Sequence, residues 1–247
     1  ESSAGFAYDS YPTDMPSDIQ VSEIPLSEVL PYFDWKMFYA IWGVKYGSAV
    51  PEAMELMQLR RDAEDELALE DCRIMLTARF FPANSADGDI CFMAEDKEMR
   101  LPMMRQEGGK GLSLSDFVIP ADSGRTSPFG MFAISVHKKS KAHVQGCSCP
   151  ACSNAYEDMI GRTVRMTLAE AASNWLNTQL KADKIIKPAA GYASCPDHTL
   201  KGDIIDMLSG KYSLGIKLTE SYAMIPEASI CGFIFMHPQA RYPEIRK

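Results

Sequence analysis

Residues 73–94 read RIMLTARFFPANSADGDICFMA, and this stretch decides the fold class. The runs 73–81 and 89–94 are rich in apolar and aromatic residues, and the segment 84–88 between them consists of turn-forming residues. Such a pattern predicts two antiparallel strands joined by a hairpin loop of about five residues. Further strands are expected at 101–105, 114–119, 129–136 and 225–236. The middle of the chain is therefore expected to form an antiparallel sheet.

Amphipathic helices are expected before and after these strands. They cover 27–44 in two pieces, 52–69, 156–180 and 199–208. Pro51 is typical of the first position of a helix, and Asp34 can cap another by accepting hydrogen bonds from free backbone N–H groups. No repeat or low-complexity linker divides the chain, so we expect one α+β domain over 26–247. An extended arm at 1–25 precedes this domain, and a cysteine-bearing insertion at 137–154 interrupts it.

The composition excludes several classes of protein. With 247 residues, 46% of them hydrophobic and 10% aromatic, the chain can bury a large core, so disorder is excluded as its main state. Its 25 basic and 33 acidic residues give a net charge of −8, which is the wrong sign for a protein that neutralises phosphates, so no nucleic-acid partner is expected. No apolar run reaches the ~18–20 residues of a membrane helix, and no secretory signal opens the sequence. We therefore expect a cytoplasmic protein with no membrane contact.

Cysteines define one candidate metal site. Cys147, Cys149 and Cys152 lie close together in the 137–154 insertion, and three neighbouring thiolates can hold zinc or an iron–sulfur cluster. His143 or His137 could supply a fourth ligand. The competing interpretation is an exposed insertion loop with incidental cysteines, and a redox role for this loop is a further hypothesis. The other cysteines are scattered, which is typical of reduced thiols: Cys72, Cys91, Cys195 and Cys231.

Six motifs occur in a fixed order between about residues 26 and 242. They are Asp34-Trp35 with Phe38 and Trp42; Phe81-Pro82-Ala83-Asn84 with Asp87 to Ile90; Leu114-x-Asp116-Phe117-Val118-x-Pro120; Pro188-Ala189-Ala190-Gly191-Tyr192-x-x-Cys195-Pro196-x-His198; Leu218-Thr219-Glu220-Ser221-Tyr222-Ala223-Met224; and Pro226-x-Ala228-Ser229 leading to His237-Pro238. Together they resemble the C-terminal activation domain of cobalamin-dependent methionine synthase, the module that binds S-adenosylmethionine. The resemblance implies a C-shaped single α+β domain around a twisted antiparallel sheet flanked by helices.

The resemblance also implies a function. In that family the activation domain presents S-adenosylmethionine to inactive cob(II)alamin while a flavodoxin-type donor supplies an electron, and methylcobalamin is regenerated. The chain would then be part of a methyltransferase system in methionine synthesis, contributing placement and electrostatics, with no catalytic side chain of its own. It lacks the Asp-x-His-x-x-Gly motif of cobalamin domains, so cobalamin is expected on a partner domain or corrinoid protein. We expect a free-standing activation protein in preference to an excised domain.

A set of residues matches the ligand-binding positions of the family. They are Asp34, Glu170, Lys187, Ala189, Gly191, Tyr192 and Tyr242. By residue type alone, Asp34 is a helix cap and Glu170 a solvent-facing carboxylate; the resemblance implies that Asp34 pairs with the ligand's amino group and Glu170 lies near its sulfonium. Lys187 would hold the carboxylate, the Gly191–Tyr192 turn would approach the adenosine, and Tyr242 would close over the ligand.

The sequence departs from the family at several of these positions. Lys187 replaces an arginine, so the charge remains but the bidentate fork is lost, at an expected cost of ~1–2 kcal/mol in affinity. Pro243 replaces the second tyrosine of a closing pair, Met166 replaces an acid one helical turn before Glu170, and a loop expected before Lys187 is missing. These departures leave an alternative open: an interaction protein of the same fold that docks on a corrinoid protein without binding S-adenosylmethionine.

Overall fold

The computed structural model describes residues 5–44, 50–107, 111–140, 155–209 and 214–243. Its strands are β1 (Ile19–Ile24), β2 (Cys72–Ala86), β3 (Asp89–Ala94), β4 (Lys97–Pro102), β5 (Ser127–Lys138), β6 (Lys217–Leu218), β7 (Met224–Ile225) and β8 (Ser229–Ile234). Its α-helices are α1 (Leu26–Val29), α2 (Trp35–Ile41), α3 (Val50–Ala68), α4 (Ala155–Gln179) and α5 (Leu200–Leu208). Short 3-10 helices occupy Tyr8–Ser10, Leu30–Tyr32, Leu114–Phe117 and Ala121–Ser123.

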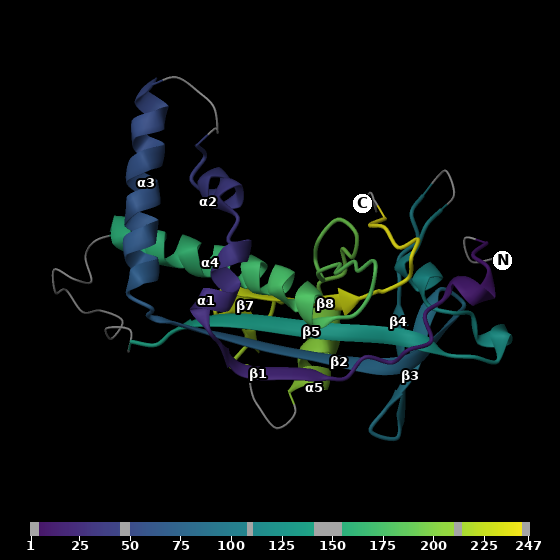
Figure 1. The fold of residues 1–247 in the computed structure, drawn as a ribbon. Helices are drawn as coiled ribbons and strands as arrows, with labels where there is room; N and C mark the ends of the chain where they lie inside the picture. Colours follow the sequence, from purple (N-terminus) through teal and green to yellow (C-terminus); the bar gives the residue numbers. More distant parts are fainter. Residues whose placement is uncertain (1–4, 45–49, 108–110, 141–154, 210–213, 244–247) are drawn as a thin grey trace.

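A single antiparallel sheet forms the centre of the molecule (Figure 1). Its strand order is β4-β3-β2-β5-β8, and β1 pairs with β2 beside this path. The long strands β2 and β5 pair continuously from Cys72 opposite Lys138 to Ala83 opposite Ser127. The predicted α+β fold with an antiparallel sheet is therefore confirmed.

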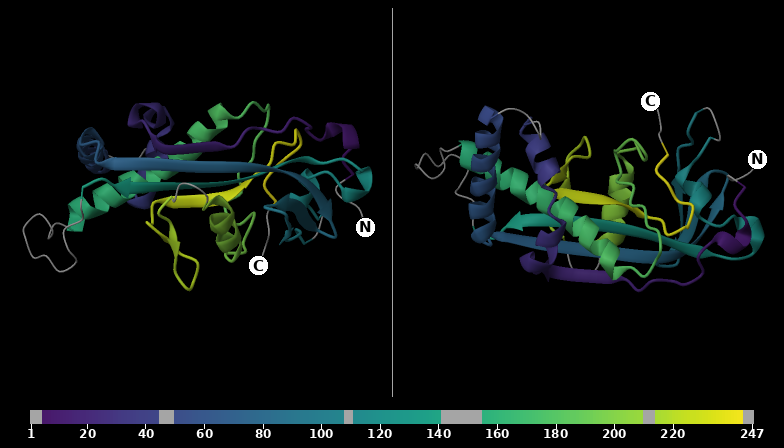
Figure 2. Two further views of the ribbon diagram at one scale, coloured as in Figure 1. Left: turned by 90° about the horizontal axis from the view of Figure 1, so that it is seen from below. Right: turned by 45° about the horizontal axis from the view of Figure 1, so that its top comes forward.

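Alternate residues of the sheet enter two apolar cores, one on each face. Ile74 and Leu76 of β2 pack in the core formed with α1–α4, whereas Met75 and Phe81 pack in the core that includes α5. Figures 1 and 2 show α4 along one face of the sheet and α5 against the other. Because both faces are covered, the central strands are apolar on both sides, as the almost uninterrupted burial of β5 shows.

The helices agree well with the sequence prediction. Those expected at 52–69, 156–180 and 199–208 are α3, α4 and α5, with ends within two residues of the predicted ones. Asp34 caps α2 as predicted, since its Oδ1 accepts hydrogen bonds from the backbone N–H groups of Lys36 at 2.9 Å and Met37 at 3.2 Å. Among the helices that the structure describes, none is long and apolar enough to cross a membrane.

The turns of the β2–β3–β4 region differ from the prediction. Strand β2 extends to Ala86, so the turn to β3 contains only Asp87 and Gly88, with φ of 54° and 90°. The predicted five-residue loop is wrong because an Asp-Gly pair takes the two left-handed positions of a tight hairpin turn. A second tight turn at Glu95 and Asp96, again with positive φ, places β4 earlier than the expected strand.

The segment expected to be a strand at 114–119 is instead the 3-10 helix Leu114–Phe117. The Ser113 hydroxyl and the Asp116 carboxylate form a capping box at its start, in which Asp116 accepts from the Ser113 N–H at 2.9 Å. Arg105 donates two hydrogen bonds of 2.8 Å to the same carboxylate. Local capping and this ion pair therefore favour a 3-10 helix over the expected strand.

The expected strand at 225–236 is divided. Strand β7 ends at Ile225, and the Ser229 hydroxyl donates to the Pro226 carbonyl at 2.7 Å in the turn that follows. Strand β8 then begins at Ser229. The short pair β6–β7 was not predicted, because strands of two residues carry no periodic pattern.

We expect Arg105→Met to lower the free energy of unfolding by about 2 kcal/mol, because it leaves the Asp116 carboxylate without its cationic partner. The side chain of Asp116 is 1% exposed and that of Arg105 is 41% exposed, so water can offset part of the loss. Urea unfolding measures the change. Arg100→Met is the matched control: Arg100 is 48% exposed and pairs with exposed or half-buried acids, so a loss below about 0.5 kcal/mol is expected. Equal losses in both variants would contradict the prediction.

Candidate functional site

One face of α4 carries the first part of the candidate site. Met166, Glu170, Ser173 and Asn177 follow one another at spacings of four, three and four residues, which places them in a row along the helix. The Lys187 ammonium group donates hydrogen bonds to the Ser173 carbonyl and to the Asn177 side-chain oxygen. Lys187 is thereby fixed against this row, C-terminal to Glu170.

The segment that carries Lys187 and Ala189 runs antiparallel to β8. Four backbone hydrogen bonds join them: Ile186 N–H to Phe235 O and Phe235 N–H to Ile186 O, both at 3.0 Å, Phe233 N–H to Pro188 O at 3.1 Å, and Ala190 N–H to Cys231 O at 3.2 Å. The two backbones lie close together at Gly232, where an added Cβ would lie 2.3 Å from the Pro188 oxygen. The site is thus built on the sheet by a contact that only glycine allows.

Opposite charges share this partly buried region. Burial raises the pKa of Glu170, and the nearby Lys187 ammonium opposes that effect. Burial also lowers the pKa of Lys187 to about 8, against the favourable influence of Glu170. The pKa of Tyr192 is raised by burial and by Glu170. In the parts of the chain that the structure describes, Glu170 and Lys187 form no direct ion pair, so each charge can still interact with a ligand.

The Gly191–Tyr192 turn follows. Gly191 has a φ of 93°, and an added Cβ there would lie 2.6 Å from the His198 ring. Nδ1 of His198 accepts a hydrogen bond from the Lys201 ammonium at 3.2 Å, and Lys201 also donates to the Tyr222 carbonyl at 3.1 Å. Lys201 is only 8% exposed. The sequence did not predict that His198 and Lys201 support this turn. The one indication was that His198 ends the motif that begins at Pro188, and that Lys201 follows shortly after it.

Tyr242 joins the same cluster from the C-terminal segment. Its hydroxyl oxygen accepts a hydrogen bond from the Lys187 backbone N–H at 3.0 Å. Tyr192 and Tyr242 are 61% and 55% exposed, so both rings are available at the surface. The structure therefore brings together the predicted residues of α4, the segment beside β8 and the C-terminal segment.

Asp34 is placed differently. Its exposed carboxylate caps α2, and α2 packs against α4, the helix that carries Glu170. Over the described ranges, no hydrogen bond or ion pair links Asp34 to Glu170 or Lys187. A role for Asp34 toward a ligand stays a prediction.

The predicted cysteine site belongs to the 137–154 insertion. Cys147, Cys149, Cys152 and His143 lie outside the described residues. The described His137 uses Nε2 to donate to the Leu214 carbonyl at 2.8 Å. No group of three His, Cys, Asp or Glu residues suited to a metal ion occurs within the described ranges, and the four cysteines there are free thiols. A metal at the insertion stays a prediction.

The family model of the vitamin B12 dependent methionine synthase activation domain matches residues 25–247. A solved structure, the MetH reactivation domain bound to AdoHcy, is similar with a TM-score of 0.80 and 25% sequence identity. The match covers 98% of this chain and 86% of that one.

Proposed function

Because the chain belongs to the family of vitamin B12-dependent methionine synthase activation domains, we propose that it binds S-adenosylmethionine and presents it to a cobalamin held by another domain or protein. When bound, S-adenosylmethionine supplies the methyl group for reductive methylation of cob(II)alamin in methionine synthesis. A flavodoxin-type protein is the proposed source of the electron. The similar MetH structure, which carries AdoHcy, supports a ligand of this type.

The single observation that carries the proposal is the convergence of Glu170 and Lys187 beside two exposed tyrosines. S-adenosylmethionine has a sulfonium cation and a carboxylate, so it needs one protein charge of each sign. Glu170 is suited to the sulfonium and Lys187 to the carboxylate. The residues present therefore fit this ligand.

The remaining roles complete the proposed site. The adenosine would approach the backbone at Ala189 and Gly191, and the rings of Tyr192 and Tyr242 would cover it. Asp34 is proposed to pair with the ligand's amino group, through the carboxylate oxygen that does not cap α2. The chain's own contribution is to bind and orient the methyl donor, which removes the entropic cost of bringing donor and acceptor together.

Isothermal titration with S-adenosylmethionine tests this proposal. We expect saturable heat and a rise in the melting temperature, because a ligand that binds only the folded state stabilises it. No heat and no thermal shift at millimolar ligand, with the protein folded, would overturn the small-molecule part. A complex with a cobalamin-loaded partner that forms equally well without ligand would then favour the alternative, an interaction protein of the same fold.

We expect Glu170→Gln to weaken binding of S-adenosylmethionine about fivefold, equivalent to about 1 kcal/mol, and to leave binding of AdoHcy nearly unchanged. The reason is that AdoHcy has a neutral thioether in place of the sulfonium. Titration of both ligands into both proteins measures the change. Asp158→Asn removes the same charge from the first turn of α4, three helical turns away, and should change neither affinity. If Glu170→Gln weakens both ligands equally, Glu170 does not recognise the sulfonium.

A further inference from the structure

A cavity of about 440 Å³ lies where β2 begins and β5 ends. Its walls include Arg73, Met75, His137, Lys138, Lys139 and Leu214. Met75 and Leu214 belong to the apolar core on the α5 side of the sheet, whereas the Glu170 helix α4 covers the other side. None of the described residues that line the cavity belongs to the proposed S-adenosylmethionine site, so the two sites are separate. Its size is in the range of small-molecule sites.

The rim of this cavity is basic. The described residues that line it include three permanent cations and no acid, in a chain with a net charge of −8. Lys139 forms an ion pair with Glu23 at 2.8 Å, and Lys138 lies 3.9 Å from Asp71. Asp71 is already engaged by the N–H and the hydroxyl of Ser140, at 2.6 and 2.5 Å. Glu23 also interacts electrostatically with Arg73, so two acids oppose three cations and neutralise the rim only in part.

Arg73 has unused donors. Its Nε donates to the Ser22 carbonyl at 3.0 Å, which fixes the direction of the guanidinium group. Its two terminal nitrogens make no hydrogen bond or ion pair with any residue that the structure describes. A planar guanidinium held at one nitrogen presents the other two as a preformed fork for an oxyanion.

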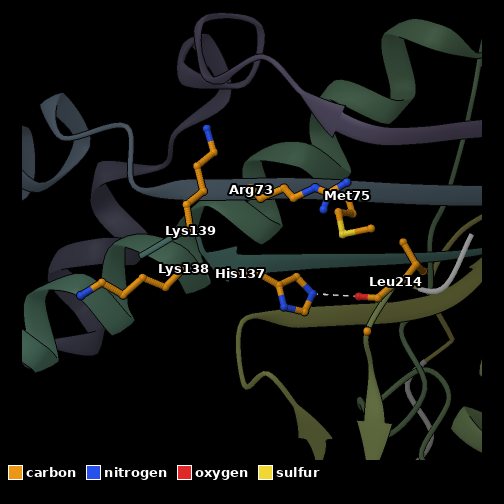
Figure 3. A pocket seen from close by; sticks show the side chains of 7 residues that line it. Arg73, Met75, His137, Lys138, Lys139 and Leu214 are labelled. Carbon is orange, nitrogen blue, oxygen red and sulfur yellow. Dashed lines mark hydrogen bonds between the residues drawn. The ribbon is translucent and has the colours of Figure 1, made fainter. Parts of the chain in front are cut away.

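Apart from the cations, the lining is mostly apolar, and hydrogen bonds anchor it at Leu214. His137 donates from Nε2 to the Leu214 carbonyl at 2.8 Å, and the Ser135 hydroxyl donates to the same oxygen at 2.7 Å. Figure 3 shows Arg73 and Met75 on one strand and the His137 ring on the next, turned toward Leu214. The side chains of Lys138 and Lys139 point away from the ring, so they add positive potential without direct contact.

We propose that this cavity binds a small phosphate ester with an apolar group. Its phosphate would lie on the two terminal nitrogens of Arg73, and its apolar group would pack on Met75 and Leu214. The two lysines would favour the anion through their field. Neither an anion alone nor an apolar molecule alone contacts both the Arg73 nitrogens and the apolar side chains. A ligand that combines the two groups should therefore bind most tightly.

Phenyl phosphate is the probe, with inorganic phosphate and phenol as its two halves. We expect phenyl phosphate to bind more tightly than either half at constant ionic strength. Arg73→Gln should weaken it about tenfold, because a bidentate charge-assisted contact is lost. The matched control is Lys97→Gln, which removes an exposed cation from β4 at the other end of the sheet and should change the affinity less than twofold. Arg73→Lys keeps the charge without the fork and should be intermediate.

Two readouts locate the ligand. Proton NMR signals of the His137 ring should shift with phenyl phosphate, while those of the distant, fully buried His237 should not. Saturating S-adenosylmethionine should not compete, so failure of the proposed main function would leave this test intact. Equal weakening by Arg73→Gln and Lys97→Gln, absence of binding, or competition by S-adenosylmethionine would each overturn the proposal. Thermal unfolding of each variant shows that it is folded.

Discussion

Gly232→Ala is expected to lower the free energy of unfolding by about 3 kcal/mol and to weaken S-adenosylmethionine binding at least about fiftyfold. An added Cβ would lie 2.3 Å from the Pro188 carbonyl oxygen and 2.8 Å from the Ala189 Cα. Both are backbone atoms, so the clash cannot be relieved by a side-chain rotation. The segment must move away from β8, and Lys187, Ala189 and Gly191 move with it.

Gly202→Ala provides a matched control for this substitution. Gly202 lies within α5, and its added Cβ would be 3.7 Å from the Tyr222 ring, an ordinary contact. Alanine is favoured over glycine inside a helix, so this variant should gain about 0.5–1 kcal/mol. Denaturant unfolding and ligand titration of both variants measure the difference. If Gly232→Ala retains normal affinity, the contact between Pro188 and β8 does not position the site.

The fold was largely predictable because two strong patterns agree with it. The apolar and aromatic runs at 73–81 and 129–136 correspond to β2 and β5, the central pair of the sheet. Local turn chemistry at Asp87 and Gly88 explains the wrong hairpin loop, and a tertiary contact explains the wrong strand at 114–119. Leu114–Phe117 is helical because Asp116 is held by Arg105, a residue nine positions before the helix that no local pattern connects to it.

The candidate site was predictable only through the family resemblance. In the sequence, Glu170 looks like a surface carboxylate. It lies near Lys187 only because the segment after α4 returns along β8. The helical spacing of Ser173 and Asn177 from Glu170 was visible in the sequence. Nothing local indicated that the Lys187 ammonium would bind there.

Binding of AdoHcy is expected to weaken progressively above about pH 8, because Lys187 must be protonated to hold the ligand carboxylate. Burial lowers the pKa of Lys187 to about 8 from its ordinary value of 10.5. Above pH 8 the free protein must take up a proton in order to bind, so the affinity can fall up to about tenfold per pH unit. AdoHcy is the better probe here because it has no sulfonium, so its binding does not depend on the proposed contact with Glu170.

Lys187→Arg separates this effect from titration of the ligand's own amino group. Arginine stays charged throughout and restores the bidentate fork, so we expect affinity to rise by about 1–2 kcal/mol at pH 7 and its decline between pH 7 and 9 to be smaller. The ratio of the two proteins' affinities at each pH cancels the titration of the ligand. A ratio that does not change with pH would show that the Lys187 charge is not used in binding.

Stability should change in the opposite direction, which gives an independent check. Between about pH 8 and 10.5 the unfolded chain keeps the Lys187 proton that the folded chain has lost. The unfolded state then binds more protons, so the contribution of Lys187 to the free energy of unfolding rises with pH in this window. Comparing urea unfolding of the wild type with Lys187→Arg, which does not titrate there, isolates that contribution. Loss of the Lys187 proton should therefore weaken ligand binding and stabilise the fold. If ligand affinity and the free energy of unfolding change in the same direction as the pH rises, Lys187 is not the carboxylate-binding group.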